Sequence, residues 1–165
     1  MLQHLLSWGI ELQQKGTKSM PYRREGNTLY IRVDKGQKIV ETIRRICQKE
    51  HIHGGYFTGI GACCEAVLAT WDVEKKEFST HQLQGMLELV SLLGKISLEK
   101  DGTPCIHCHG TFSYVNAAGQ LSVAAGHLVD TTIGYTGEVV LHVAEKPINR
   151  MYDVAAGIDV WDLHV

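Results

Sequence analysis

The chain has 165 residues, of which 44% are hydrophobic and 21% charged, and its formal net charge is −2 at pH 7. These values are ordinary for a soluble globular domain and exclude the basic balance that attracts nucleic acid to a whole surface. The sequence contains neither an apolar run of the ~20 residues that span a membrane nor a secretion signal. We therefore expect a cytoplasmic protein without a membrane partner.

The five cysteines favour reduced thiols rather than a disulfide framework, because their number is odd and Cys63 and Cys64 are adjacent. Cys105 and Cys108 form a C-x-x-C motif, which in redox proteins opens a helix. In a strand the two sulfurs point to opposite faces. Redox chemistry is therefore the weaker interpretation of this motif.

Residues 1–27 are predicted to be a leader, and residues 28–165 the folded domain. The leader begins with a short amphipathic piece and continues as a polar linker without periodicity. We interpret its basic part as a solvated, mobile stretch rather than as a contact for nucleic acid. The amphipathic residues are Leu2, Leu5, Leu6 and Ile10, and the basic residues are Lys15, Lys18, Arg23 and Arg24.

The domain begins with a predicted half-buried strand, in which Leu29, Ile31 and Val33 alternate with polar or partly polar residues. A helix is expected from about residue 37 to 50, with one apolar stripe and Asp34 as its N-cap. We interpret His51 and His53, next to two glycines, as the turn that leaves this helix.

Two strands, or one interrupted strand, are predicted over residues 56–60 and 66–73, and a short strand near 78–83. The nearly continuous apolar run from Leu87 to Leu98 indicates a central strand. Glu88 is its exception, because a carboxylate among apolar side chains needs a cation, a donor or a raised pKa. Glu88 is therefore a candidate general base, unless it lies at the wet end of the strand.

A cluster of histidines follows in the segment TPCIHCH, residues 103–109. In a strand, Cys105, His107 and His109 lie on one face. A hairpin turn at residues 116–119 would bring His127, in the next predicted strand, to the level of His107 or His109. Three neutral imidazoles suit zinc or another divalent transition metal, with a fourth position left open. Alternatively, His107 and His109 are solvated and His127 is a hydrogen-bonded core histidine.

Further strands are predicted over residues 137–144 and 158–163, which makes about seven or eight strands and one long helix. Because short turns join most of the strands, we expect an α+β domain. Its largely antiparallel sheet would carry the one main helix on one face.

Several segments follow one another in a characteristic order. They are the strand that contains Arg32, Gly59-x-Gly61-Ala62, the run from Glu88 to Ser97, Pro104-x-x-His107-x-His109, Gly126-His127-Leu128 and Glu138. Together they resemble the PPC domain family, named for plants and prokaryotes, and the resemblance covers about residues 28–163.

The resemblance implies an α+β fold that assembles into homotrimers. It also implies that His107, His109 and His127 hold a metal, usually zinc, near the subunit boundary. Many prokaryotic members are called predicted DNA-binding proteins by analogy with plant relatives that carry AT-hooks. This sequence departs from the plant pattern, since PYRREG lacks the Arg-Gly-Arg core that enters a minor groove.

Three functions follow as hypotheses. The first is a zinc-binding homotrimer whose open metal position takes a small anionic or polar ligand for hydrolytic or lyase chemistry, with Glu88 as the base. The second is a DNA-associated or regulatory protein without an AT-hook. The third is a structural oligomer in which the metal only joins subunits. The pattern leaves open whether the protein is an enzyme.

Overall fold

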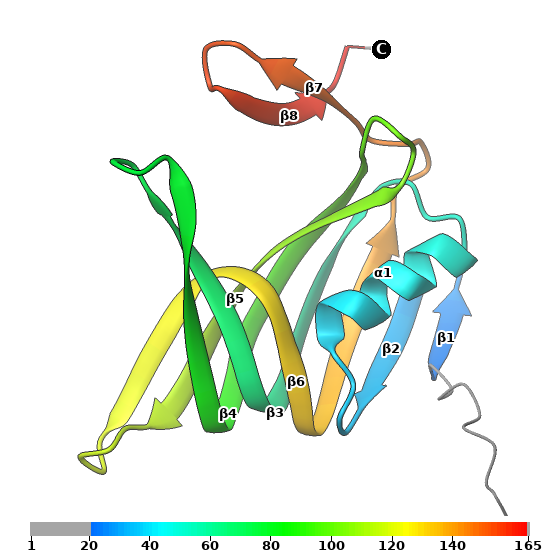
Figure 1. Ribbon diagram of the computed structural model, residues 1–165. Coiled ribbons are helices and arrows are strands. Elements are labelled where there is room, and N and C mark those ends of the chain that lie inside the picture. Colours follow the sequence, from blue (N-terminus) through cyan, green and yellow to red (C-terminus); the bar gives the residue numbers. More distant parts are fainter. Residues whose placement is uncertain (1–20, 165) are drawn as a thin grey trace, which may run out of the picture.

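Six strands form a strongly bent antiparallel sheet in the order β1-β2-β6-β3-β4-β5, and two more form a separate hairpin (Figure 1). The computed structural model describes residues 21–164. The elements are β1 (Tyr22–Glu25), β2 (Thr28–Asp34), α1 (Ile39–Lys49), β3 (Gly55–Asp72), β4 (Glu77–Leu98), β5 (Pro104–Val115), β6 (Leu121–Val143), β7 (Asn149–Asp153) and β8 (Ile158–Asp162).

The α+β class and the mostly antiparallel pairing agree with the sequence-based expectation of about seven or eight strands, but the eight strands form two sheets rather than one. The two segments predicted at 56–60 and 66–73 are one long strand, β3, with register shifts between Gly59 and Gly61 and between Cys63 and Glu65. Such bulges bend a strand without ending it, which explains why the sequence suggests an interruption.

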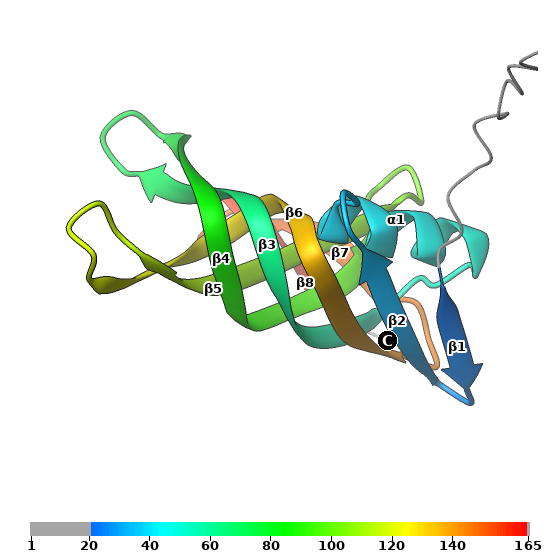
Figure 2. The ribbon, with the colours of Figure 1, turned by 90° about the horizontal axis from the view of Figure 1, so that it is seen from below.

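The strand β6 closes the sheet on itself. Its first half pairs with β5 and its later part with β3 and β2, while β3 pairs with β4 and β4 with β5. The four long strands therefore form a ring, and Figure 2 shows them curving around a common interior. Fully buried side chains fill that interior, the largest being Phe57 and Phe112.

The helix α1 buries its apolar stripe, which includes Ile39, Ile43 and Ile46, against the sheet. Its predicted N-cap, Asp34, is wrong. The Gln37 carbonyl accepts a hydrogen bond from the Ile133 amide, and Lys38 forms a bridge to Thr132 of β6. These contacts hold the connection extended, so the helix begins only at Ile39.

Asp130 of β6 caps the helix instead. Its carboxylate accepts hydrogen bonds from the backbone N–H groups of Val40 (2.9 Å) and Glu41 (3.3 Å). Burial raises the pKa of the Asp130 carboxyl, while the hydrogen bonds from Val40, Thr131 and Glu41 oppose that rise. One half-buried side chain thus joins the first turn of the helix to the sheet.

Replacement of Asp130 by alanine is expected to lower the free energy of unfolding by about 1–2 kcal/mol, the usual cost of a lost helix cap. Urea unfolding at pH 7 measures the change. Asp130→Asn keeps an acceptor oxygen and should lose less. Equal losses in the two variants would contradict a capping role.

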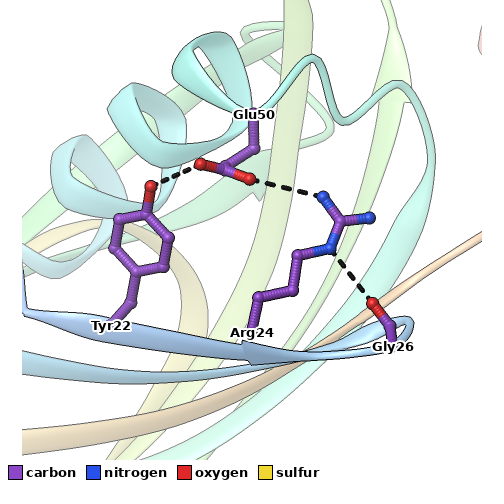
Figure 3. A network of polar contacts seen from close by, with 4 residues as sticks. All are labelled: Tyr22, Arg24, Gly26 and Glu50. Atoms are coloured by element: carbon purple, nitrogen blue, oxygen red, sulfur yellow. Dashed lines mark hydrogen bonds and ion pairs between the residues drawn. The ribbon is translucent and has the colours of Figure 1, made fainter.

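Residues 22–25, which the sequence places in the leader, form the edge strand β1 and pair with β2. The Tyr22 hydroxyl and the Arg24 guanidinium both donate to the Glu50 carboxylate just after α1, and Arg24 also donates to the Gly26 carbonyl (Figure 3). A four-residue strand with three exposed side chains has no periodicity to detect. The predicted amphipathic piece and Lys15 and Lys18 lie outside the described residues.

The hairpin of β7 and β8 stands at one end of the main sheet (Figure 1). It contains the predicted last strand, and the Leu98 amide of β4 donates to the Ile148 carbonyl just before it (2.8 Å). None of the helical structure in residues 21–164 has the length and apolar character that crossing a membrane requires.

Candidate metal centre

The pairing of β5 with β6 brings the three predicted histidines together. His109 lies directly opposite His127, and His107 follows on the same face of β5 two residues away. One ring nitrogen of each residue lies within 4.8 Å of those of the other two. The ring centroids are 5.0 Å apart for His107 and His127, and 5.5 Å apart for His107 and His109.

The face that carries the cluster points away from the core. On β5, Cys108 and Gly110 are buried on the core side, while His109 is exposed and His107 half-buried. The alternative that His127 is a core histidine is therefore wrong. Leu121, Val123 and Val129 share its face and are exposed, so the apolar character of this stretch did not indicate burial.

Burial lowers the pKa of His107 to about 4, and the neighbouring His127, Lys95, His109 and Arg150 act in the same direction. Burial and the nearby His109 also lower the pKa of His127. Both imidazoles are consequently neutral at pH 7, which is the form that binds a metal ion.

The donor set fits a zinc ion. Zinc bound by nitrogen at about 2.0–2.1 Å in a tetrahedron requires ligand atoms about 3.4 Å apart. The observed limit of 4.8 Å is within reach of small side-chain rotations. Three histidines leave one tetrahedral position for water or another ligand, as in catalytic rather than structural zinc sites.

Glu88 does not join the cluster. It lies opposite Ser113 of β5, four residues from His109, which corresponds to about 13 Å along a strand. Its side chain is exposed and lines a different cavity together with Glu138. The structure therefore brings together His107, His109 and His127 but leaves Glu88 apart, at a wet position of the strand.

Several neighbours of the cluster were not predicted. Phe78 of β4 stacks on His127, with ring centroids 5.5 Å apart. Lys95 lies directly opposite His107. Arg150 of β7 donates to the Cys105 sulfur (2.8 Å). Lys95 could have been noticed in the sequence, because it is a basic residue inside an apolar run. Phe78 and Arg150 could not, because they reach the site through long-range contacts that no local pattern encodes.

Acid is expected to destabilise the metal-free protein through His107. Its folded-state pKa, about 4, lies below the ordinary 6.5. The neutral His107 side chain therefore contributes its full stabilisation of the folded state above pH 6.5, and this contribution is lost as the pH falls towards 4. Urea unfolding with chelator between pH 7.5 and 4.5 measures this, and His107→Gln should flatten the dependence. An unchanged dependence in that variant would contradict the assignment.

The family model of the Plants and Prokaryotes Conserved (PCC) domain matches residues 20–145. No curated protein matches the chain.

Solved structures share the fold. A plant- and prokaryote-conserved (PPC) protein from Pyrococcus horikoshii is 29% identical, with 89% of this chain and 96% of that chain covered and a TM-score of 0.69. A metal-containing protein from Archaeoglobus fulgidus is 28% identical, with 88% and 99% covered and a TM-score of 0.70. A "putative DNA binding protein" from Bacteroides thetaiotaomicron is 25% identical, with 88% and 99% covered and a TM-score of 0.79.

The family match covers more than half of the chain and includes all three histidines of the cluster. The resemblance found in the sequence is thereby confirmed, and the chain belongs to the Plants and Prokaryotes Conserved domain family.

Proposed function

We propose that this protein binds one zinc ion per chain through His107, His109 and His127 and keeps one coordination position open to a small ligand. The observation that carries the proposal is the convergence of three ligand nitrogens within 4.8 Å on the outer face of the sheet. The Archaeoglobus neighbour, called a metal-containing protein, supports it.

A bound zinc ion would supply Lewis acidity at the open position. The chain's own contribution is to hold three imidazoles on two paired strands, with Phe78 stacked on the ring of His127. Glu88 stays outside this proposal, because its place on β4 separates its carboxylate from the cluster. The proposal therefore includes no general base and no named reaction.

Elemental analysis of untagged protein, purified without added metal and then offered zinc, tests the proposal. We expect about one zinc per chain after removal of loosely bound ion, since three imidazoles form a single site. Protein that stays free of zinc under these conditions would contradict it. The metal found before zinc is added would identify the ion that the site acquires in the cell.

We also propose that the protein is a homotrimer. Its outer sheet face carries exposed apolar side chains on β2, β3 and β4, including Tyr30 (45% exposed), Ile60 (60%) and Val90 (56%). Contiguous apolar surface of this kind is typical of subunit interfaces. Light scattering should give three times the mass of the chain. A trimer that dissociates on chelation would assign the metal a joining role, whereas a trimer that persists supports an open site.

DNA binding is the second candidate, favoured by the name of the Bacteroides neighbour. The net charge of −2 opposes it. If DNA is bound through phosphate contacts, affinity should fall steeply between 50 and 200 mM salt. Absence of binding at low salt, or an affinity that does not respond to salt, would exclude this function.

A further inference from the structure

The β7–β8 hairpin and the main sheet enclose a cavity beside the histidine cluster. Its volume is about 630 Å³, within the range of pockets that hold small organic molecules. His107 and His127 lie on one wall. Ile158, Val160 and Trp161 of the hairpin lie on another. A ligand bound at the open coordination position of the proposed ion could therefore extend into this cavity.

Two cations hold the hairpin in place and line the cavity. Arg150 donates to the Cys105 sulfur (2.8 Å) and to the Asp159 carbonyl (2.9 Å). The Lys95 ammonium lies 4.5 Å from the centre of the Trp161 ring. Lys95 also faces His107 across the strand pair, so both positive groups stand next to the candidate ligands.

Negative charge in the cavity wall is limited to Asp159. Its carboxylate lies 3.8 Å from the Lys100 ammonium, which leaves the charges of Lys95 and Arg150 without a carboxylate partner among the described residues. The Nε atom of Arg150 and the Oδ1 atom of Asp159 are both buried, and neither has a hydrogen-bond partner among residues 21–164.

We propose that the cavity binds a small carboxylate with an apolar or aromatic body. The carboxylate would lie between the open position of the ion, Lys95 and Arg150. The body would lie against Phe78, Ile158 and Trp161. This inference rests on the proposed zinc site and assigns the class of ligand that the site takes.

Charge and surface chemistry both support this class. A carboxylate accepts charge-assisted hydrogen bonds from guanidinium and ammonium groups and binds zinc through oxygen. The remaining lining is mostly apolar, with exposed aromatic rings at Phe78 and Trp161 that would lose contact with water when a ligand binds. A purely inorganic anion would leave these rings solvated.

Calorimetry on the zinc-loaded full chain tests the inference with benzoate, acetate and benzyl alcohol as probes. Benzoate has both the charge and the ring, acetate lacks the ring, and benzyl alcohol lacks the charge. We expect benzoate to bind at least about 10-fold more tightly than either, because each comparison removes one set of contacts. Equal affinity for benzoate and benzyl alcohol, with zinc bound, would overturn the inference and leave the zinc site standing.

Variants then separate the ligand site from the metal site. Lys95→Met keeps an apolar contact with Trp161, and Arg150→Met removes the guanidinium. Each should weaken benzoate binding at least about 10-fold while one zinc per chain remains. Lys146 is exposed and lies outside the cavity, so Lys146→Met should change neither the affinity for benzoate nor the zinc content. Unchanged benzoate affinity in both cavity variants would overturn the inference, whereas a wild-type chain that takes no zinc would overturn the proposed function as well.

Discussion

Alanine at any one of His107, His109 and His127 is expected to lower the affinity for zinc by more than about 100-fold. Loss of a residue that merely orients a metal ligand typically lowers the metal affinity about 10–100-fold. Loss of a ligand itself should lower the affinity by more than that. With two imidazoles left, water would have to complete half of the coordination shell. Competition with a chromogenic chelator measures the affinity of each variant.

The matched control is His142→Ala. His142 also lies on β6 and is exposed, but its neighbour is Tyr56 rather than the cluster. The His142→Ala variant should bind zinc as tightly as the wild type does. The three cluster variants should fold, because their side chains lie outside the core, and circular dichroism checks this. Full retention of zinc by His127→Ala would contradict the proposed coordination.

Among the substitutions considered, Gly94→Ala is expected to lower the free energy of unfolding the most. Gly94 lies on the core side of β4, and a Cβ atom built there would fall 2.1 Å from the Cζ atom of Phe57. The Phe57 ring is only 1% exposed, so it has no free space to move into. Overpacking of this severity costs about 3 kcal/mol, which for a domain of this size lowers the melting temperature by about 6–12 °C.

A second substitution tests the cause. In Phe57→Leu the ring is gone, so adding Gly94→Ala to that variant should cost much less than adding it to the wild type. Scanning calorimetry of the two single variants and the double variant gives the coupling energy. Additive losses would mean that Gly94 is needed for a reason other than its approach to Phe57.

The histidine cluster was predictable because two local rules determine it. Alternation along a strand places His107 and His109 on one face, and a short hairpin sets the level at which the next strand returns. The structure pairs His109 directly with His127, which is one of the two levels that this geometry allows. The α+β class was predictable from the alternation of short apolar segments for the same reason.

Contacts between distant parts of the chain were not predictable. Asp130 caps a helix that begins about 90 residues earlier, and the sequence suggested the nearby Asp34 because helix caps are usually local. The ring closure depends on β6 changing partners along its length, which no periodic pattern records. The ligand cavity likewise depends on the contact between Arg150 and Cys105, 45 residues apart.

Glu88 shows the limit of reading burial from composition. Its apolar neighbours suggested an enclosed carboxylate, yet alternation places it on the exposed side while Leu87 and Leu89 are buried. A continuous apolar run therefore did not mean a strand covered on both faces. Val90, an exposed apolar side chain of this run, instead lies on the surface that we propose for subunit contact.

The most direct test of the account is X-ray diffraction from crystals grown with zinc, with data collected on both sides of the zinc absorption edge. The account predicts one anomalous peak per chain, about 2.0–2.1 Å from a ring nitrogen of each of His107, His109 and His127. It also predicts a fourth ligand on the side that faces Lys95 and the β7–β8 hairpin. A zinc peak at other residues, or no peak at this cluster, would contradict the central claim.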